Sequence, residues 1–144
     1  MVLYMTAAYK KLTDYIEKLD NIEFGEWEPK VQPGDGSLER PFRMPYVVYE
    51  DVVNSFVLDV HEFCKEHPEL GLNNYQAILK QNNIAWDEKE MKNADVSEMD
   101  VQCVVALILA AVRAERFCDG ALLDFLKTGH IKKWLERLRD FENN

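Results

Sequence analysis

The residues best suited to chemistry lie together between Arg113 and Gly120, directly after a strongly apolar stretch. Arg113 and Arg116 are three positions apart, so they occupy neighbouring positions on one helix face, whereas Glu115 projects elsewhere. Two guanidinium groups at this spacing would form a fork for a phosphate or a carboxylate, with Glu115 or Asp119 orienting the fork. This segment is therefore the first candidate for a binding or catalytic site.

A structural role fits the same residues. Charged groups at the end of an apolar helix are costly to bury unless they are paired. Arg113 and Arg116 would then bond the last carbonyls of the helix, and Asp119 and Gly120 would shape a tight turn into the next helix. From the residues alone, both interpretations stay open.

Aromatic side chains supply the second half of the candidate site. Trp27, Tyr46 and Tyr49 flank a predicted hairpin. They either pack on the helices or line a pocket with the segment 113–119, because a small-ligand site usually joins apolar walls to a few polar groups. On the second interpretation, Trp27 and Tyr46 join Arg113, Glu115, Arg116 and Asp119 as candidate ligand-binding residues.

The spacing of His61, Cys64 and His67 reads H-x-x-C-x-x-H and invites a metal hypothesis. At roughly 100° per residue the two histidines project about 120° apart, so they would not converge with Cys64 on one ion. The pattern therefore indicates a core cysteine between two surface histidines, with no metal and no cofactor. Cys118 is interpreted as a buried free thiol, since nothing around it in the sequence favours a nucleophile. The chain has no Gly-rich phosphate loop, H-E-x-x-H or G-x-S-x-G motif.

Three pieces of the chain carry a resemblance to a known family. They are Gly25-Glu26-Trp27, the run Met44–Tyr49 (MPYVVY) and the segment Arg113–Gly120, which reads R-x-E-R-F-x-D-G. In these pieces the chain resembles a family of small bacterial and phage-borne proteins defined only as a domain of unknown function. That family usually has glycine where this chain has Ala114. The resemblance covers about residues 5–140 and implies a fold and a region of interest, but no activity.

The elements that must position these residues are mostly helices. Apolar residues at spacings of three and four predict helices over about 4–19, 50–66, 73–81, 119–127 and 130–142. Ser97 fits an N-cap with Asp100 at the third helical position, and the helix they begin runs to about Phe117. Only Gln102 is polar between residues 101 and 112, which predicts a helix buried on all sides. Residues 82–96 read as a connection.

One short β-hairpin interrupts the helices. Branched and aromatic residues around the turn signal Pro33-Gly34-Asp35-Gly36 predict strands over about 23–32 and 42–49. The expected fold is a single mainly α domain over residues 1–144. It has five or six helices around a buried central helix (about 97–117), with the hairpin near 23–49 packed by the N-terminal helices.

Charge and cysteine content limit the function classes. The 144 residues carry a net charge of −9, with 20 acidic and 10 basic residues among residues 1–100 and 6 acidic and 7 basic residues after them. This sign argues against a nucleic acid or an anionic membrane as a direct partner, because both select clustered Lys and Arg. The three cysteines have no close spacing, and the first residues lack the order of a signal peptide, so a cytoplasmic location is expected. The oligomeric state stays open.

Three functions are compatible with these observations. The first is a non-catalytic interaction module, encoded by a phage or another mobile element, that acts on a host protein through its acidic surface. The second is a binder of a small anionic ligand, such as a nucleotide, through the region of Arg113 and Arg116. The third is a hydrolase or transferase in which Glu115 or Asp119 is the base and the arginines stabilise negative charge. The first leads, because no recognised catalytic motif is present and the acidic excess is regional.

Overall fold

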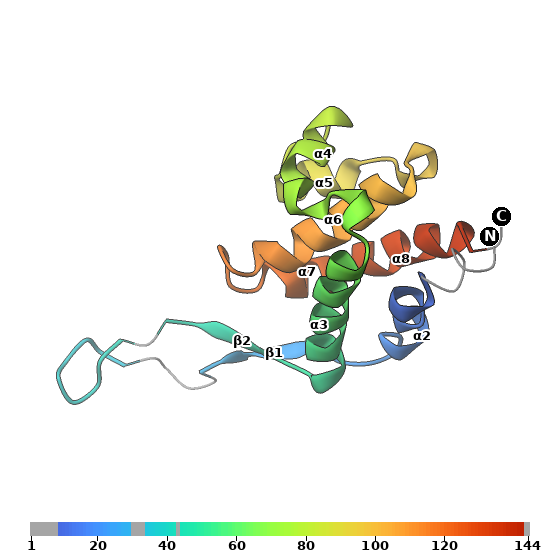
Figure 1. Cartoon of the computed structure of the whole chain (residues 1–144). Coiled ribbons are helices and arrows are strands. Elements are labelled where there is room, and N and C mark those ends of the chain that lie inside the picture. The colour runs from blue at the N-terminus through green and yellow to red at the C-terminus, as the bar shows by residue number, and fades with distance from the viewer. Residues whose placement is uncertain (1–8, 30–33, 43, 143–144) are drawn as a thin grey trace.

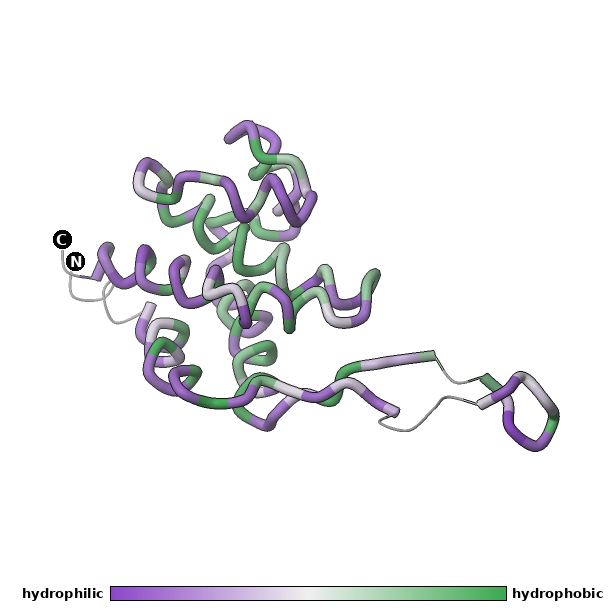
Figure 2. The backbone as a smooth tube through the Cα atoms, turned by 180° about the vertical axis from the view of Figure 1, so that it is seen from behind, coloured by the Kyte–Doolittle hydropathy of each residue, from purple (hydrophilic) through white to green (hydrophobic). Residues whose placement is uncertain are grey.

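Helix α6 (Val101–Ala114) forms the centre of the molecule, as its apolar sequence predicts. Every residue from Cys103 to Val112 is buried, and α3, α4, α7 and α8 all pack against α6. In Figure 1 these helices surround α6 in the computed structural model, which describes residues 9–29, 34–42 and 44–142. The backbone coloured by hydropathy has its strongest hydrophobic segment at this position (Figure 2). The prediction of a mainly helical fold with one antiparallel hairpin is confirmed.

The first helix is less regular over its described residues than its apolar pattern predicts. Residues 9–13 are helical, Asp14 is a turn, and α2 continues over Tyr15–Lys18. The predicted residues 4–8 lie outside the described ranges. This segment packs beside α8 (His130–Asp140), where Arg139 Nη2 donates to the carbonyl of Thr13 and its guanidinium pairs with Glu17 at 2.7 Å.

Two long amphipathic helices agree with the prediction. Helix α3 (Asp51–Glu66) directs an apolar stripe inward, with Val53, Phe56, Val60 and Phe63 fully buried. Helix α8 does the same with four residues at helical spacing: Ile131, Trp134, Leu135 and Leu138. Such stripes drive helix packing because each buried aliphatic or aromatic side chain contributes about 1.5–3 kcal/mol.

The hairpin is shorter than predicted. Strands β1 (Gly25–Glu28) and β2 (Tyr46–Tyr49) pair antiparallel, with Gly25 opposite Tyr49 and Glu28 opposite Tyr46. Pro29 follows β1 and Pro45 precedes β2, and proline cannot donate to the ladder, so the pairing stops there. The predicted strand residues 30–32 and 43 fall outside the described ranges. Beyond β1 and β2 the chain extends away from the helices (Figure 1).

The segment between α3 and α6 contains more helix than expected. It comprises the 3-10 turns η1 (Pro68–Leu70) and η2 (Leu72–Asn74), helix α4 (Tyr75–Gln81), helix α5 (Glu88–Asn93) and the 3-10 turn η3 (Val96–Glu98). The interpretation of residues 82–96 as a plain connection is therefore wrong, because α5 lies within them. In total the described residues hold seven α-helices against the five or six expected.

The start of α6 also differs from the prediction. Ser97 is not its N-cap, because Ser97 lies in η3, where its N–H donates to Asp95. Asp100 is the N-cap instead and accepts the N–H of Cys103 at 2.9 Å. The central helix thus covers Val101–Ala114 rather than 97–117. No helix among the described residues is both long enough and apolar enough to span a bilayer.

Candidate functional site

The segment from Arg113 to Gly120 leaves the helix earlier than expected, and its side chains diverge. Helix α6 ends at Ala114, whose carbonyl accepts the N–H groups of Phe117 and Cys118 in a tight turn. Arg113 is still within the helix, whereas Arg116 is beyond its end and exposed. The two arginines therefore do not share a helix face.

Glu115 points toward the hairpin and the start of α7 (Ala121–Lys127). Its carboxylate accepts the N–H of Gly120 at 3.0 Å and the N–H of Leu122 at 3.0 Å, so it satisfies the free donors at the start of that helix. The hydroxyl of Tyr49 donates to the same carboxylate at 2.7 Å and accepts the N–H of Leu123 at 3.0 Å. Burial, and then the bond to Glu115, raise the pKa of Tyr49. Glu115 thus ties β2 to α7.

Glycine is required at position 120 for two reasons. Its φ of +89° lies in the region that residues with a Cβ rarely adopt, and a Cβ there would lie 2.3 Å from Cζ2 of Trp27. The Trp27 ring therefore rests on the Gly120 backbone, and 45% of this side chain remains exposed. Asp119 precedes this helix but does not cap it, because Gly120 occupies the N-cap position and Glu115 supplies the acceptor.

The predicted site residues are therefore only partly brought together. Trp27 lies opposite Val47 in the ladder, on the hairpin face that also carries Tyr49 and meets the turn before α7. Strand alternation sends Tyr46 to the opposite face, where 43% of it is exposed. Asp119 is exposed at the surface of the turn.

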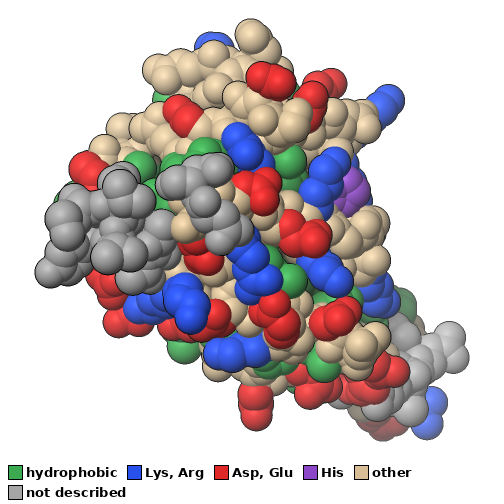
Figure 3. All heavy atoms as spheres, turned by 90° about the vertical axis from the view of Figure 1, so that its right-hand side faces the viewer, with side chains coloured by type: hydrophobic (Ala, Val, Ile, Leu, Met, Phe, Trp, Pro, Cys, Tyr) green, Lys and Arg blue, Asp and Glu red, His purple; other side chains and the backbone are tan. Residues whose placement is uncertain are grey.

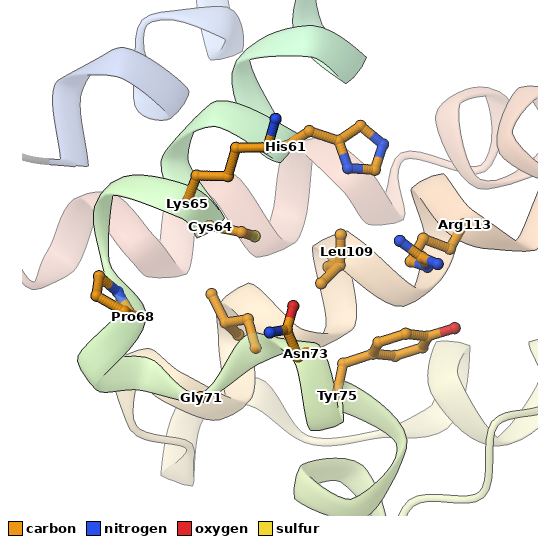
Figure 4. Close-up of a pocket in the computed structure, with 10 residues that line it drawn as sticks. His61, Cys64, Lys65, Pro68, Gly71, Asn73, Tyr75, Leu109 and Arg113 are labelled. Carbon is orange, nitrogen blue, oxygen red and sulfur yellow. The ribbon is translucent and has the colours of Figure 1, made fainter.

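Arg113 points in a different direction, into a cavity of about 390 Å³. Figure 4 shows its guanidinium between the ring of His61 and the ring of Tyr75. The walls come from three places in the chain, namely α3, the turns leading into α4, and the end of α6. The lining residues are His61, Cys64, Lys65, Pro68, Gly71, Leu72, Asn73, Tyr75, Leu109 and Arg113.

Helix α3 supplies the basic wall because its charges are segregated by face. Positions 61, 64 and 65 are three and four apart and share one side of the helix. The acids use another side: Glu62 and Glu66 each accept Lys11 Nζ at 3.1 Å, and Asp59 accepts the hydroxyl of Tyr15 at 2.6 Å. The acidic face therefore meets the N-terminal helical segment, and the basic face lines the cavity.

The opposite wall holds Arg113 in a fixed setting. Its guanidinium carbon lies 5.7 Å from the Tyr75 ring centroid, and that ring packs edge-on against Trp86 at 5.8 Å. Trp86 is itself held by a 3.4 Å bond from its Nε1 to the carbonyl of Ala110. The Nε of Arg113 is buried, and no described residue gives it a hydrogen-bond partner. A buried donor without a partner costs about 1–3 kcal/mol.

The electrostatics of the cavity are positive. Burial, and then the positive charges of Arg113, Lys65 and Arg116, lower the pKa of His61. Burial raises the pKa of Cys64 to about 11, with Arg113 acting in the opposite direction. Cys64 is thus a neutral thiol near pH 7 and a poor nucleophile, since the thiolate is the reactive form.

His67 does not join the other two members of the H-x-x-C-x-x-H pattern. Its Nδ1 is 2.9 Å from Glu69, and its ring stacks on Phe63 with centroids 4.3 Å apart. Within the described ranges, no group of three His, Cys, Asp or Glu side chains has the arrangement of a metal site. Cys118, interpreted as buried, is exposed.

Sequence reasoning identified Arg113 but missed His61, Lys65, Asn73 and Tyr75 as its neighbours. The one available signal was the four-residue spacing of His61 and Lys65, which places both on one face of a strongly predicted helix. Nothing in the sequence indicated which face of α6 would meet them.

Comparison with known proteins adds a family. A family model described as "Family of unknown function (DUF6508)" matches residues 5–144. None of the curated proteins and none of the solved structures compared with the chain matches it.

Proposed function

We propose that the chain, which belongs to DUF6508, a family of unknown function, binds a small organic anion in the cavity beside Arg113. One observation carries the proposal. Arg113, Lys65 and His61 line a single cavity, and none of its described lining residues is acidic. A concave site with apolar walls and a few convergent polar groups is the usual form of a small-ligand site.

The overall charge makes this positive cavity more significant. The chain carries a net charge of −9, so an anion is repelled over much of its surface. On the face shown in Figure 3, acidic and basic side chains are interleaved rather than gathered by sign. A local excess of positive charge inside a cavity is therefore a selective feature for an anionic ligand.

The proposal is for binding without chemistry. Glu115, the residue suggested as a catalytic base, uses its carboxylate to accept the N–H groups of Gly120 and Leu122 and the hydroxyl of Tyr49. Asp119 is exposed in the turn and does not line the cavity. Neither carboxylate faces the space in which a substrate would lie.

Matched variants test the proposal with AMP as the probe, measured by thermal shift and calorimetry on the full chain. Asn73→Asp places a negative charge in the cavity wall, whereas Asn74→Asp places the same charge on the adjacent exposed residue outside it. Lys65→Ala removes a cavity charge, and Lys80→Ala removes an exposed lysine from the other side of α4.

We expect AMP to stabilise the wild type, Asn74→Asp and Lys80→Ala. Asn73→Asp should abolish the stabilisation, and Lys65→Ala should raise Kd about tenfold, because a hydrogen bond to an ionised group contributes about 1.5 kcal/mol at the lower end of its range. Equal effects of the paired variants, or no response of the wild type to AMP, would overturn the proposal.

A second candidate, a protein partner, is favoured by a separate observation. Among the described residues, large exposed apolar side chains concentrate on the hairpin and its extension: Trp27, Leu38, Phe42, Met44, Tyr46 and Val48. Exposed apolar groups of this kind often mark interaction surfaces. The partner would be a cytoplasmic protein of the host, on which this chain, encoded by a phage or another mobile element, acts through its acidic surface.

This second candidate has its own matched test. Met44 is 82% exposed on the hairpin and Leu58 is 68% exposed on α3. If the hairpin binds a partner, Met44→Ser should reduce capture of one defined protein from a host lysate, and Leu58→Ser should not. Reversal of the acids in the 81–100 segment should abolish the capture if acidic contacts contribute. Capture that survives both changes would refute this candidate.

A further inference from the structure

The cavity beside Arg113 indicates which anionic group the ligand carries. Resting on the proposed function, we infer that the ligand is a small organic phosphate whose phosphoryl dianion is bound by Arg113, Lys65 and His61, and that its binding draws a proton onto His61. A phosphoryl preference and proton uptake by His61 can each be absent while the cavity still binds anions.

The number of cationic groups favours a phosphoryl group over a carboxylate. Lys65 and Arg113 bring two fixed positive charges, and the imidazole of His61 adds a third nitrogen donor from the same cavity wall. A carboxylate offers one charge and two oxygens, whereas a phosphate monoester offers about two charges and three strong acceptor oxygens near pH 7. The lining therefore matches the phosphoryl group in charge and in donor count.

The placement of these groups allows the protein to contact a bound phosphoryl group from two sides. His61 and Lys65 are one helical turn apart on α3, and Arg113 reaches toward them from α6 (Figure 4). Arg113 itself lines the same cavity, whereas its Nε is buried. Arginine binds phosphate oxygens with two parallel N–H groups, so it is well suited to the central contact.

The surroundings of His61 couple binding to protonation. The charged and titratable groups near it are Lys65 and Cys64 from its own helix, Arg113 and Arg116 from the end of α6 and the turn that follows, and Tyr75 from α4. Among the described residues, no acidic side chain lines this space, so the surroundings of His61 oppose a proton on the imidazole. A bound dianion reverses the local sign of the potential and favours the imidazolium.

The remaining walls describe the rest of the ligand. Pro68, Leu72, Leu109 and the ring of Tyr75 give the same cavity apolar lining. Cavities of about 300–1,000 Å³ hold organic ligands, so a volume of about 390 Å³ far exceeds what an inorganic phosphate ion fills. A planar or apolar group attached to the phosphoryl group would complete the contact.

The test compares two probes with one aromatic body, 1-naphthyl phosphate and 1-naphthoate. Titration calorimetry on the full chain at pH 7.5, in two buffers of different ionisation enthalpy, gives Kd and the number of protons taken up. At this pH the phosphate monoester is already a dianion, since its second pKa is about 6, so net uptake reports on the protein. His61→Gln is the test variant, and His130→Gln, outside the cavity, is its control.

We expect 1-naphthyl phosphate to bind at least tenfold more tightly than 1-naphthoate, with proton uptake between zero and one. His61→Gln should abolish the uptake and weaken phosphate binding about tenfold, since the amide can still donate to the phosphate but cannot supply the positive charge of the imidazolium, and a charge-assisted bond is stronger than a neutral one. His130→Gln should change neither quantity.

Each contrary result identifies what has failed. Equal affinity for the two probes, sensitive to Asn73→Asp, would overturn the phosphoryl assignment and leave anion binding intact. Preference for the phosphate without proton uptake would overturn the role of His61. Tighter binding of a phosphotyrosine peptide than of 1-naphthyl phosphate would overturn the assignment to a small molecule. No response of the wild type to AMP would refute the proposed function together with this inference.

Discussion

Glu115→Ala tests whether the turn before α7 is held by the Glu115 carboxylate. The change removes the acceptor of the Gly120 and Leu122 N–H groups and of the Tyr49 hydroxyl, all within 3.0 Å of the carboxylate. Tyr49 keeps its bond from the N–H of Leu123, so part of the link between β2 and α7 survives.

The expected loss of stability follows from these bonds. Removal of an N-cap acceptor costs about 1 kcal/mol, and the charge-assisted bond from Tyr49 contributes about 1.5–3 kcal/mol more. Water reaches the freed N–H groups in part, because Glu115 is half-buried. We therefore expect the free energy of unfolding to fall by about 3 kcal/mol, which is a decrease in Tm of about 10 °C for a domain of this size.

The assay is urea unfolding followed by circular dichroism, with Glu115→Gln and Arg116→Ala beside Glu115→Ala. Glutamine keeps one acceptor oxygen, so Glu115→Gln should lower the free energy of unfolding by about 1 kcal/mol. Arg116 is exposed and has no hydrogen bond or ion pair to any described residue, so Arg116→Ala should change the free energy of unfolding by no more than about 0.5 kcal/mol. If Glu115→Ala is as mild as Arg116→Ala, the capping role is refuted. Loss of AMP binding by Glu115→Gln at unchanged stability would instead place the carboxylate in a ligand site.

Three further predictions concern other parts of the molecule. Gly120→Ala should lower the free energy of unfolding by about 1–3 kcal/mol, because of its positive φ and the Trp27 ring at 2.3 Å from the new Cβ, and the double variant with Trp27→Ala should recover part of the loss in urea unfolding. Asp100→Ala should lower the free energy of unfolding by about 1 kcal/mol in the same measurement, because Asp100 caps the central helix, and Ser97→Ala should lower it less. A larger loss for Ser97→Ala than for Asp100→Ala would restore Ser97 as the cap. Burial lowers the pKa of His61 from its ordinary value of 6.5 in the folded chain, so the unfolded chain binds this proton at a higher pH than the folded chain does. The free energy of unfolding should therefore fall as the pH drops below about 6.5. Between pH 7.5 and 5.5 it should fall less in His61→Gln than in the wild type.

Helices with a clear apolar stripe were predictable from the sequence. The stripes of α3 and α8 and the nearly continuous apolar run of α6 each gave the type and approximate position of the element. Helix α5 was missed because its sequence EKEMKN buries only Met91, so no periodicity identifies it. A helix held by one buried side chain and by its neighbours carries too little local information to predict.

The ends of elements were harder to predict because several residues compete for one capping role. Both Asp95 and Asp100 stand near Ser97, and the order S-x-x-D fits a capping box as well as it fits the observed arrangement. The 3-10 turn η3 decides between them, since it uses Asp95 for its own start and leaves Asp100 to cap α6. The start of α7 shows the same competition, because the Glu115 carboxylate, and not the adjacent Asp119, accepts the N–H groups of Gly120 and Leu122.

The candidate site was predictable only in part because its walls are distant in the sequence. Arg113 was identified because a charge at the end of an apolar helix needs an explanation. His61 and Lys65 come from a helix about fifty positions earlier, and only the packing of α3 beside α6 unites them. The periodic pattern gives each helix its buried face but says nothing about which polar flanks meet.

The two readings of the Arg113–Gly120 segment concern different residues: Glu115 holds a structural turn, and the proposed ligand site involves Arg113. Arg113 and Glu115 are two positions apart, and residues at that spacing leave a helix in widely separated directions. Arg113 therefore faces the cavity between α3 and α4, while Glu115 turns to β2 and α7. Because the two environments share no side chain, substitutions at Glu115 or Gly120 should act on stability, and substitutions at Lys65 or Asn73 on ligand binding. In this acidic protein, the acids of α3 and of this turn thus make contacts that face away from the cavity beside Arg113, so the lining of that cavity stays positive.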